Sequence, residues 1–425
     1  MRKNKTLLFL VVFLLGVGWL ALSVAQANVT ISLWKASHGA DLEVMPGILQ
    51  AFEEANPGIK VDFLSHPWEG WDERYGVAFA AGDPPDVSYM PDEFWPRFAE
   101  AGLLARFDQL FPKDVAILEP EFPEAFWRLT TYKGHQYAVP FLWVAIAMFY
   151  NRDLFEEAGL TVPPSNLDDP ALDEWTWETF VDVAQKLTLP EQDQWGFSWS
   201  AAFRDPNYLY PFFYQAGTDV LDLENNRAAF YGPEGVAALQ FIVDLVHTYQ
   251  VIPVEGMHPD FHQIFFEGKA ALAPVESYSV PIIRSQFPDL NVGVTFKPQG
   301  PGVDFFGGRG TFGNSGYWVM SEACQEKEAA WELIKWLSNR ESVQQFNDAV
   351  GLFGARKDFV PDPDEPLYRV FFESQRFMPG YPLHPQLRQV HSIVMAEVQN
   401  AVLLAKTPEQ AIRDASEAVN ALLQE

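Results

Sequence analysis

The chain has 425 residues, which is more than one hydrophobic core usually serves. Hydrophobic residues make up 48% of it and charged residues 20%, a composition that excludes a disordered chain. The formal net charge is -28 at pH 7, and a field of that sign repels phosphates, so nucleic acid and anionic membrane surfaces are excluded as partners. The single cysteine, Cys324, excludes an intramolecular disulfide.

The first 27 residues have the three parts of a secretory signal peptide. Arg2, Lys3 and Lys5 precede an apolar run at 7–24, and the small residues of the 25–27 segment suit the signal peptidase. The alternative is an uncleaved anchor helix, because the apolar run nearly spans a bilayer. We expect cleavage after residue 27, which lowers the net charge to -31 by removing three basic residues. A lipid anchor would need a cysteine directly after the signal, and the single cysteine is Cys324, so the sequence predicts a periplasmic or extracellular protein without a lipid anchor.

The N-terminal third alternates strand and helix patterns. Period-two and helical patterns, separated by glycine and proline breakers, predict strands at 29–34, 59–64 and 86–90 and helices at 43–55, 69–81 and 93–101. This βαβ order predicts a parallel sheet.

The rest of the chain reads mainly as helices. Segment 137–150 is almost continuously apolar, which predicts one strand buried on both faces. Thr176 is the expected N-cap of a helix, and further helices are predicted at 153–158, 235–249, 326–337, 387–404 and 408–423.

Several short segments, in their order and spacing, carry a family resemblance. They are ISLW at 31–34, FEEANPGIKV at 52–61, AAGDPPDV at 80–87, AGLL at 101–104, FYNRDLF at 149–155, TWE at 176–178, GKAAL at 268–272 and AAWE at 329–332. With them the chain resembles the family 1 extracellular solute-binding proteins, the sugar receptors of ABC importers related to maltose-binding protein. The loop at 165–175 is longer than the family usually has.

The resemblance implies an α/β, two-lobe periplasmic-binding-protein fold, in which each lobe is a mostly parallel sheet flanked by helices and the ligand cleft lies between the lobes. It implies an N-terminal lobe at 28–141 and 296–355 and a C-terminal lobe at 142–295 and 356–425. It further implies a monomer that needs no cofactor or metal, captures a sugar by hinge closure and delivers it to the membrane permease subunits of an ABC importer.

Ligands of open α/β sheets bind beyond the carboxyl ends of strands. With the family architecture, this position selects His38, Trp68, Trp71, Glu93, Trp95, Gly308 and Arg309 in the first lobe and Trp143, Asp205, Tyr210, Tyr278 and Tyr381 in the second. The carboxylates would accept hydrogen bonds from sugar hydroxyls, the aromatic rings would stack on sugar faces, and the glycine would let the backbone approach closely.

Other sites and functions are open to the sequence. The segment 307–313 lacks the lysine and hydroxyl residue of a phosphate loop, and His258 with His262 lacks a third metal ligand nearby. An exported glycosidase would also need a cleft with carboxylates and aromatic rings. A binding protein for glycerol phosphate or an anionic sugar would use Arg309 with Arg74 or Arg356.

Overall fold

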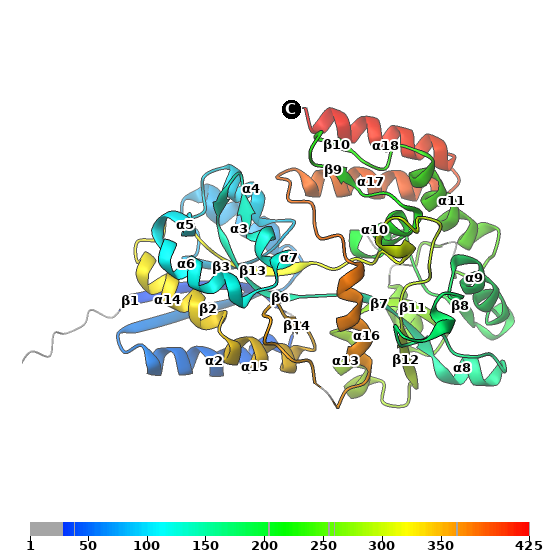
Figure 1. The fold of residues 1–425 in the computed structure, drawn as a ribbon, viewed down its shortest axis with the longest axis horizontal. Coiled ribbons are helices and arrows are strands. Elements are labelled where there is room, and N and C mark those ends of the chain that lie inside the picture. The colour runs from blue at the N-terminus through cyan, green and yellow to red at the C-terminus, as the bar shows by residue number, and fades with distance from the viewer. Residues whose placement is uncertain are drawn as a thin grey trace, which may run out of the picture.

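The computed structural model describes residues 29–37, 39–202, 205–253, 256–258, 260–362 and 364–424. The predicted signal peptide and His38 lie outside the described residues. Figure 1 shows two lobes side by side, each built around its own sheet with helices packed on it. The predicted two-lobe α/β fold is confirmed.

The first lobe contains a six-stranded sheet in the order β14-β6-β13-β3-β1-β2. Its strands are β1 Val29–Ala36, β2 Ile59–His66, β3 Val87–Pro91, β6 Ala138–Trp143, β13 Ser315–Met320 and β14 Phe353–Gly354. Strand β1 pairs in parallel with both β2 and β3, as the βαβ pattern predicts. Strand β13 returns from the second lobe and is antiparallel to both β3 and β6.

Helices cover both faces of this sheet. They are α2 Asp41–Ala55, α3 Trp71–Ala81, α4 Trp95–Glu100, α5 Phe107–Leu110, α6 Pro112–Leu118, α7 Glu124–Trp127, α14 Lys327–Leu337 and α15 Arg340–Val350. The apolar faces of α2, α14 and α15 share one core with alternate residues of the strands. Helices α3 and α4 form a separate aromatic core with the residues between them. This alternation is what a sheet covered on both sides requires.

The second lobe contains a four-stranded sheet in the order β12-β7-β11-β8. Its strands are β7 Ile146–Asn151, β8 Trp195–Phe197, β11 Ala270–Glu276 and β12 Val292–Thr295. Its helices are α8 Arg152–Glu157, α9 Trp177–Lys186, α10 Pro206–Ala216, α11 Pro233–His247, α12 Phe261–Phe266, α13 Ser279–Gln286, α16 Leu367–Ser374, α17 Leu387–Val402 and α18 Pro408–Leu422. Strand β7 is antiparallel to both of its neighbours, and only β11 and β8 pair in parallel. Both sheets are therefore mixed, where the sequence predicts mostly parallel ones.

Two short hairpins stand apart from the main sheets. Strand β4 Thr131–Tyr132 pairs with β5 His135–Gln136, and β9 Leu221–Asp222 pairs with β10 Arg227–Ala228, both antiparallel. Within the described residues, none of the helices combines the length and the apolar character needed to cross a bilayer.

The first passage of the chain between the lobes has no breaker signal. The single strand predicted at 137–150 is wrong: the segment forms β6 in the first sheet and β7 in the second, joined by Val144 and Ala145. Both strands and the joint are buried, so hydrophobicity alone does not mark the break. The chain returns between β12 and β13, and 378–386 runs along the junction before α17, as Figure 1 shows. The predicted lobe boundaries remain predictions.

Candidate functional site

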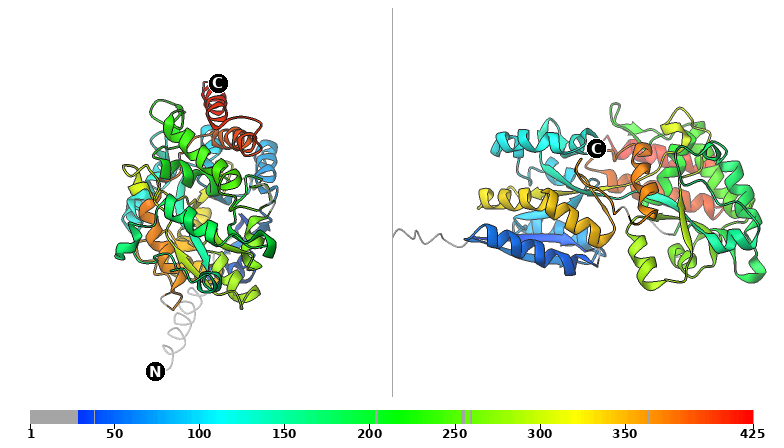
Figure 2. Two further views of the ribbon diagram at one scale, coloured as in Figure 1. Left: turned by 90° about the vertical axis from the view of Figure 1, so that its right-hand side faces the viewer. Right: turned by 60° about the horizontal axis from the view of Figure 1, so that its bottom comes forward.

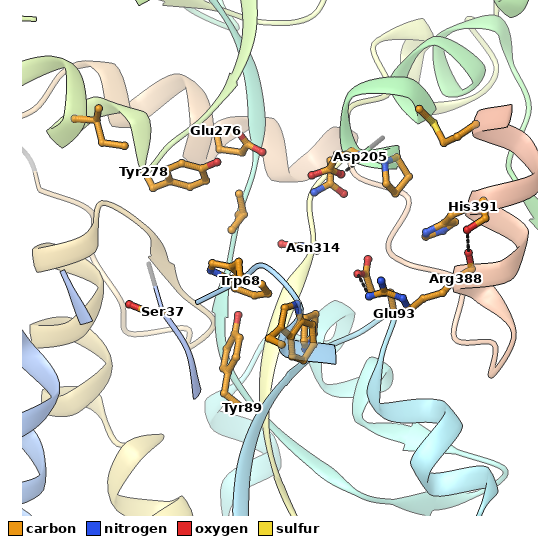
Figure 3. Close-up of a pocket in the computed structure, with 18 residues that line it drawn as sticks. Ser37, Trp68, Tyr89, Glu93, Asp205, Glu276, Tyr278, Asn314, Arg388 and His391 are labelled. Carbon is orange, nitrogen blue, oxygen red and sulfur yellow. Dashed lines mark hydrogen bonds and ion pairs between the residues drawn. The ribbon is translucent and has the colours of Figure 1, made fainter. Parts of the chain in front are cut away.

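A cavity of about 650 Å³ lies where the two lobes meet. Five of the predicted site residues line it: Trp68, Trp71, Glu93, Asp205 and Tyr278. Residues that the sequence did not select complete its lining, chiefly Ser37, Tyr89, Asn207, Glu276, Asn314, Arg388, His391, Ser392 and Met395. Figure 3 shows Trp68, Tyr89 and Glu93 on one side of this space and Asp205, Glu276 and Tyr278 on the other.

The first lobe supplies an aromatic wall from the ends of β2 and β3. Trp68 follows β2, and Trp71 is the first residue of α3, after a left-handed turn at Gly70 (φ 68°). The rings of Trp68 and Trp71 meet edge to face, with centroids 5.3 Å apart, and Trp68 also contacts Tyr89 at 6.3 Å. Trp71 is 5% exposed and packs on Phe94, whereas Trp68 is only half-buried. Trp68 therefore offers more ring surface to a ligand.

The second lobe supplies a polar wall from the start of α10 and the end of β11. Asp205 is the N-cap of α10, and its Oδ1 accepts a hydrogen bond from the backbone N–H of Asn207 at 2.9 Å. Glu276 is the last residue of β11, and Tyr278 follows at the start of α13. The right-hand view of Figure 2 shows the two lobes from another side, with the junction between them.

Glu93 joins the lobes through its carboxylate. The Tyr381 hydroxyl, from the segment before α17, donates to Glu93 Oε2 at 2.6 Å. Arg388 of α17 lies with Nη1 3.8 Å from Glu93 Oε1 and with Nη2 2.7 Å from Asp72 Oδ2 in α3. We call these contacts of Tyr381 and Arg388 with Glu93 and Asp72 the interlobe clasp. The clasp holds Glu93 in place, so one of its oxygens already has a donor from the protein.

Burial shifts the protonation of the cavity groups. It raises the pKa of Asp205 to about 7, although the Asn207 N–H opposes the shift. Burial and the neighbouring Asp205 carboxylate together raise the pKa of Glu276 to about 8. Burial lowers the pKa of His391 to about 3, so this imidazole is neutral near pH 7. Two carboxyl groups that face the cavity thus resist ionisation when no ligand balances them.

Six predicted site residues do not line the cavity. They are Trp95, Trp143, Tyr210, Gly308, Arg309 and Tyr381. Three of them are core aromatics: Trp95 packs against Tyr137, Trp143 against Phe353, and Tyr210 against Phe312 and His391. Because all three are less than 2% exposed, they have no ring face left for a ligand.

The other three have structural positions as well. Arg309 is 4% exposed, and its guanidinium donates to the backbone carbonyls of Leu172, Trp175 and Lys297. Gly308 has a positive φ of 69°, and a Cβ there would come within 2.6 Å of the Gly300 carbonyl oxygen. Tyr381 lies behind Glu93 in the clasp.

The residues that the sequence missed had weak signals. Glu276 ends an apolar strand two residues before the selected Tyr278, a polar interruption that could have marked it. Asn314 follows a glycine-rich run. Arg388 stands near the start of an ordinary amphipathic helix, so only the fold brings it to the cavity. In the described part of the chain, no group of three or more histidine, cysteine, aspartate or glutamate residues is arranged to hold a metal ion.

Comparisons with known proteins find solute-binding proteins. The family model described as bacterial extracellular solute-binding protein matches residues 36–344. The maltotriose-binding protein of Pyrococcus abyssi is 21% identical over 90% of this chain and 78% of its own length. The sn-glycerol-3-phosphate-binding periplasmic protein of Salmonella paratyphi A is 24% identical over 94% of this chain and 93% of its own. Among solved structures, maltose-bound MalE3 of T. maritima is 27% identical and covers 93% of this chain and 100% of its own, with a TM-score of 0.78.

Proposed function

This chain belongs to the bacterial extracellular solute-binding proteins, and from that premise we propose that it is the sugar receptor of an ABC importer. The observation that carries the proposal is the cavity itself, in which an aromatic wall from one lobe faces a carboxylate wall from the other. Aromatic faces bury the apolar C–H side of a sugar ring, while carboxylates accept its hydroxyl hydrogen bonds. Relatives named for maltotriose and maltose support the same ligand class.

The cavity chemistry favours a sugar over a phosphate, although one relative is named for glycerol phosphate. Asp205, Glu93 and Glu276 all line the cavity, and each of them repels an anion when it is ionised. The one arginine in the lining, Arg388, already pairs with Asp72. Arg309, which an anion-binding site was expected to use, is committed to backbone carbonyls.

The protein is proposed to capture its ligand without converting it. Capture alone is what membership of the solute-binding family supports. A glycosidase needs an acid and a base or nucleophile that both reach one glycosidic bond, and one of the three cavity carboxyl groups, Glu93, is already hydrogen-bonded in the clasp. We expect a monomer, exported through the N-terminal signal, that closes over the sugar and presents it to permease subunits. Closure would follow from ligand contacts made to both lobes at once.

Isothermal titration calorimetry with mono- and oligosaccharides, polyols and glycerol phosphate tests the ligand class. We expect at least one sugar to bind and glycerol phosphate not to bind. Solution scattering at saturation is expected to give a smaller radius of gyration. Glycerol phosphate as the tightest ligand would overturn the proposal, and so would sugar products released during incubation with oligosaccharides.

A further inference from the structure

The polar wall of the cavity holds two carboxyl groups in a buried setting. Glu276 is 4% exposed, and its Oε2 has no hydrogen-bond partner among the described residues: His262 Nε2 lies 3.9 Å away, and the Tyr278 hydroxyl donates to the same carboxyl group without satisfying this oxygen. Asp205 faces the same cavity, and its Oδ1 accepts the hydrogen bond from the Asn207 N–H. Each carboxylate disfavours ionisation of the other, as the raised pKa of Glu276 reflects. A buried acceptor without a donor costs free energy until something in the cavity satisfies it.

The charged groups around these carboxyls do not satisfy them. Arg388 pairs with Asp72. His391 and His262 are neutral near pH 7, since burial lowers their pKa values to about 3 and about 4. Lys297 is a further cation nearby: its buried ammonium interacts with Glu276, and burial lowers its pKa to about 7. Among the described residues, Lys297 is the cation that lowers the pKa of Glu276, and none lowers the pKa of Asp205.

We propose that the ligand is a sugar carrying a protonated amine, and that its ammonium group binds between Asp205 and Glu276. This inference rests on the proposed sugar-binding function and narrows it to amino sugars. An ammonium has three N–H donors, enough for both carboxylates, and its charge relieves their mutual repulsion. The half-buried ring of Trp68 on the opposite wall also favours a cation, because an aromatic face attracts positive charge.

A matched series of ligands isolates the amine. Glucosamine, glucose and N-acetylglucosamine share a ring and differ at C2, as do galactosamine, galactose and N-acetylgalactosamine. Chitosan, cello- and chitin-oligosaccharides of two or three units extend the comparison to β-linked chains. By calorimetry at pH 7, at least one amine member is expected to bind about 10- to 100-fold more tightly than both its hydroxyl and its acetamido counterpart, the range of charge-assisted hydrogen bonds.

Two amide variants test whether the ammonium group binds at Asp205 and Glu276. Glu276→Gln and Asp205→Asn are each expected to bring the affinity ratio of amine to hydroxyl member close to one, because an amide cannot balance the ammonium charge. Glu224→Gln removes the same charge from the exposed turn between β9 and β10 and is expected to retain the ratio. Thermal unfolding checks that each variant is folded, and either cavity variant suffices if the other is not.

The outcomes separate this inference from the proposed function. Neutral sugars that bind as tightly as their amine counterparts overturn the amine inference and leave the sugar receptor standing. A wild-type preference for amines that survives in both cavity variants also overturns it. If no member of the panel binds and a neutral sugar outside it does, the amine inference fails and the sugar receptor stands; if the solute that binds is not a sugar, both proposals fail.

Discussion

Replacement of Tyr381 by phenylalanine is expected to weaken sugar binding about 5- to 30-fold, although Tyr381 does not line the cavity. The substitution removes only the hydroxyl that donates to Glu93 Oε2 at 2.6 Å. The ring remains, so its contacts with Phe312 and His391 are preserved. Because the hydrogen bond joins the two lobes, its loss destabilises the arrangement in which both walls reach the ligand.

The magnitude follows from the charge on the acceptor. A hydrogen bond to a carboxylate contributes about 1.5–3 kcal/mol, more than a neutral one. Arg388 still faces Glu93 at 3.8 Å and retains part of the interaction. A net loss of about 1–2 kcal/mol corresponds to the expected fall in affinity, since each 1.4 kcal/mol is about tenfold.

Calorimetry measures the affinity, and solution scattering measures the radius of gyration with and without ligand. A double-mutant cycle with Glu93→Gln is expected to show non-additive losses, because the two side chains share one interaction. Tyr231→Phe is the matched control, since Tyr231 is 64% exposed. If Tyr381→Phe binds within twofold of the wild type and closes to the same radius, the clasp does not couple the lobes.

The other predictions concern single side chains. Trp68→Ala is expected to weaken sugar binding about 5- to 150-fold, measured by calorimetry, with little change in melting temperature. Trp95→Phe is expected to keep the sugar affinity and to lose about 1–3 kcal/mol of folding stability, measured by thermal unfolding. Asp205→Asn keeps a side chain that can cap α10. It removes a carboxyl group whose pKa is raised to about 7 in the folded wild type, where the proton is therefore bound more tightly than in the unfolded chain. Relative to the wild type, the unliganded variant should therefore gain stability as pH rises from about 4 to about 7 and gain no more above that, as measured by urea unfolding. Arg309→Met leaves buried carbonyls without their donor and should cost at least about 2 kcal/mol while sugar affinity is unchanged; a large affinity loss in a stable variant would return Arg309 to the site.

The sequence predicted the first lobe well because its signals are local. The βαβ unit from β1 to β2 has period-two strands, an apolar helix face and a glycine breaker close together in the chain. The cap of α9 was equally readable: Thr176 accepts from Thr179 N–H, and the Thr179 hydroxyl accepts in return from Thr176 N–H. Signals of this kind depend only on neighbours in sequence.

The sequence could not separate ligand-facing aromatics from core aromatics. Trp95 and Trp71 both stand close to strand ends, but helix α4 turns Trp95 into the core against Tyr137, while Trp71 reaches the cavity. Trp143 also stands at the carboxyl end of a strand, β6, which is why the sequence selected it. Its ring nevertheless packs on Phe353, which lies more than two hundred residues away in the chain. The face of a helix or strand that lines the cavity depends on packing partners from distant parts of the chain, and the local sequence does not identify those partners.

The carboxyl groups of the two lobes have different surroundings in the cavity. In the first lobe, Glu93 accepts a hydrogen bond from the Tyr381 hydroxyl and lies 3.8 Å from the Arg388 guanidinium, both from the second lobe, so its carboxylate helps to hold the lobes together. In the second lobe, Asp205 and Glu276 face the cavity, and Glu276 has one oxygen without a hydrogen-bond partner among the described residues. A change at Glu93 should therefore weaken every ligand by a similar factor, because it acts on closure. A change at Glu276 should alter the ranking of ligands, because it acts on the contact that tells one ligand from another.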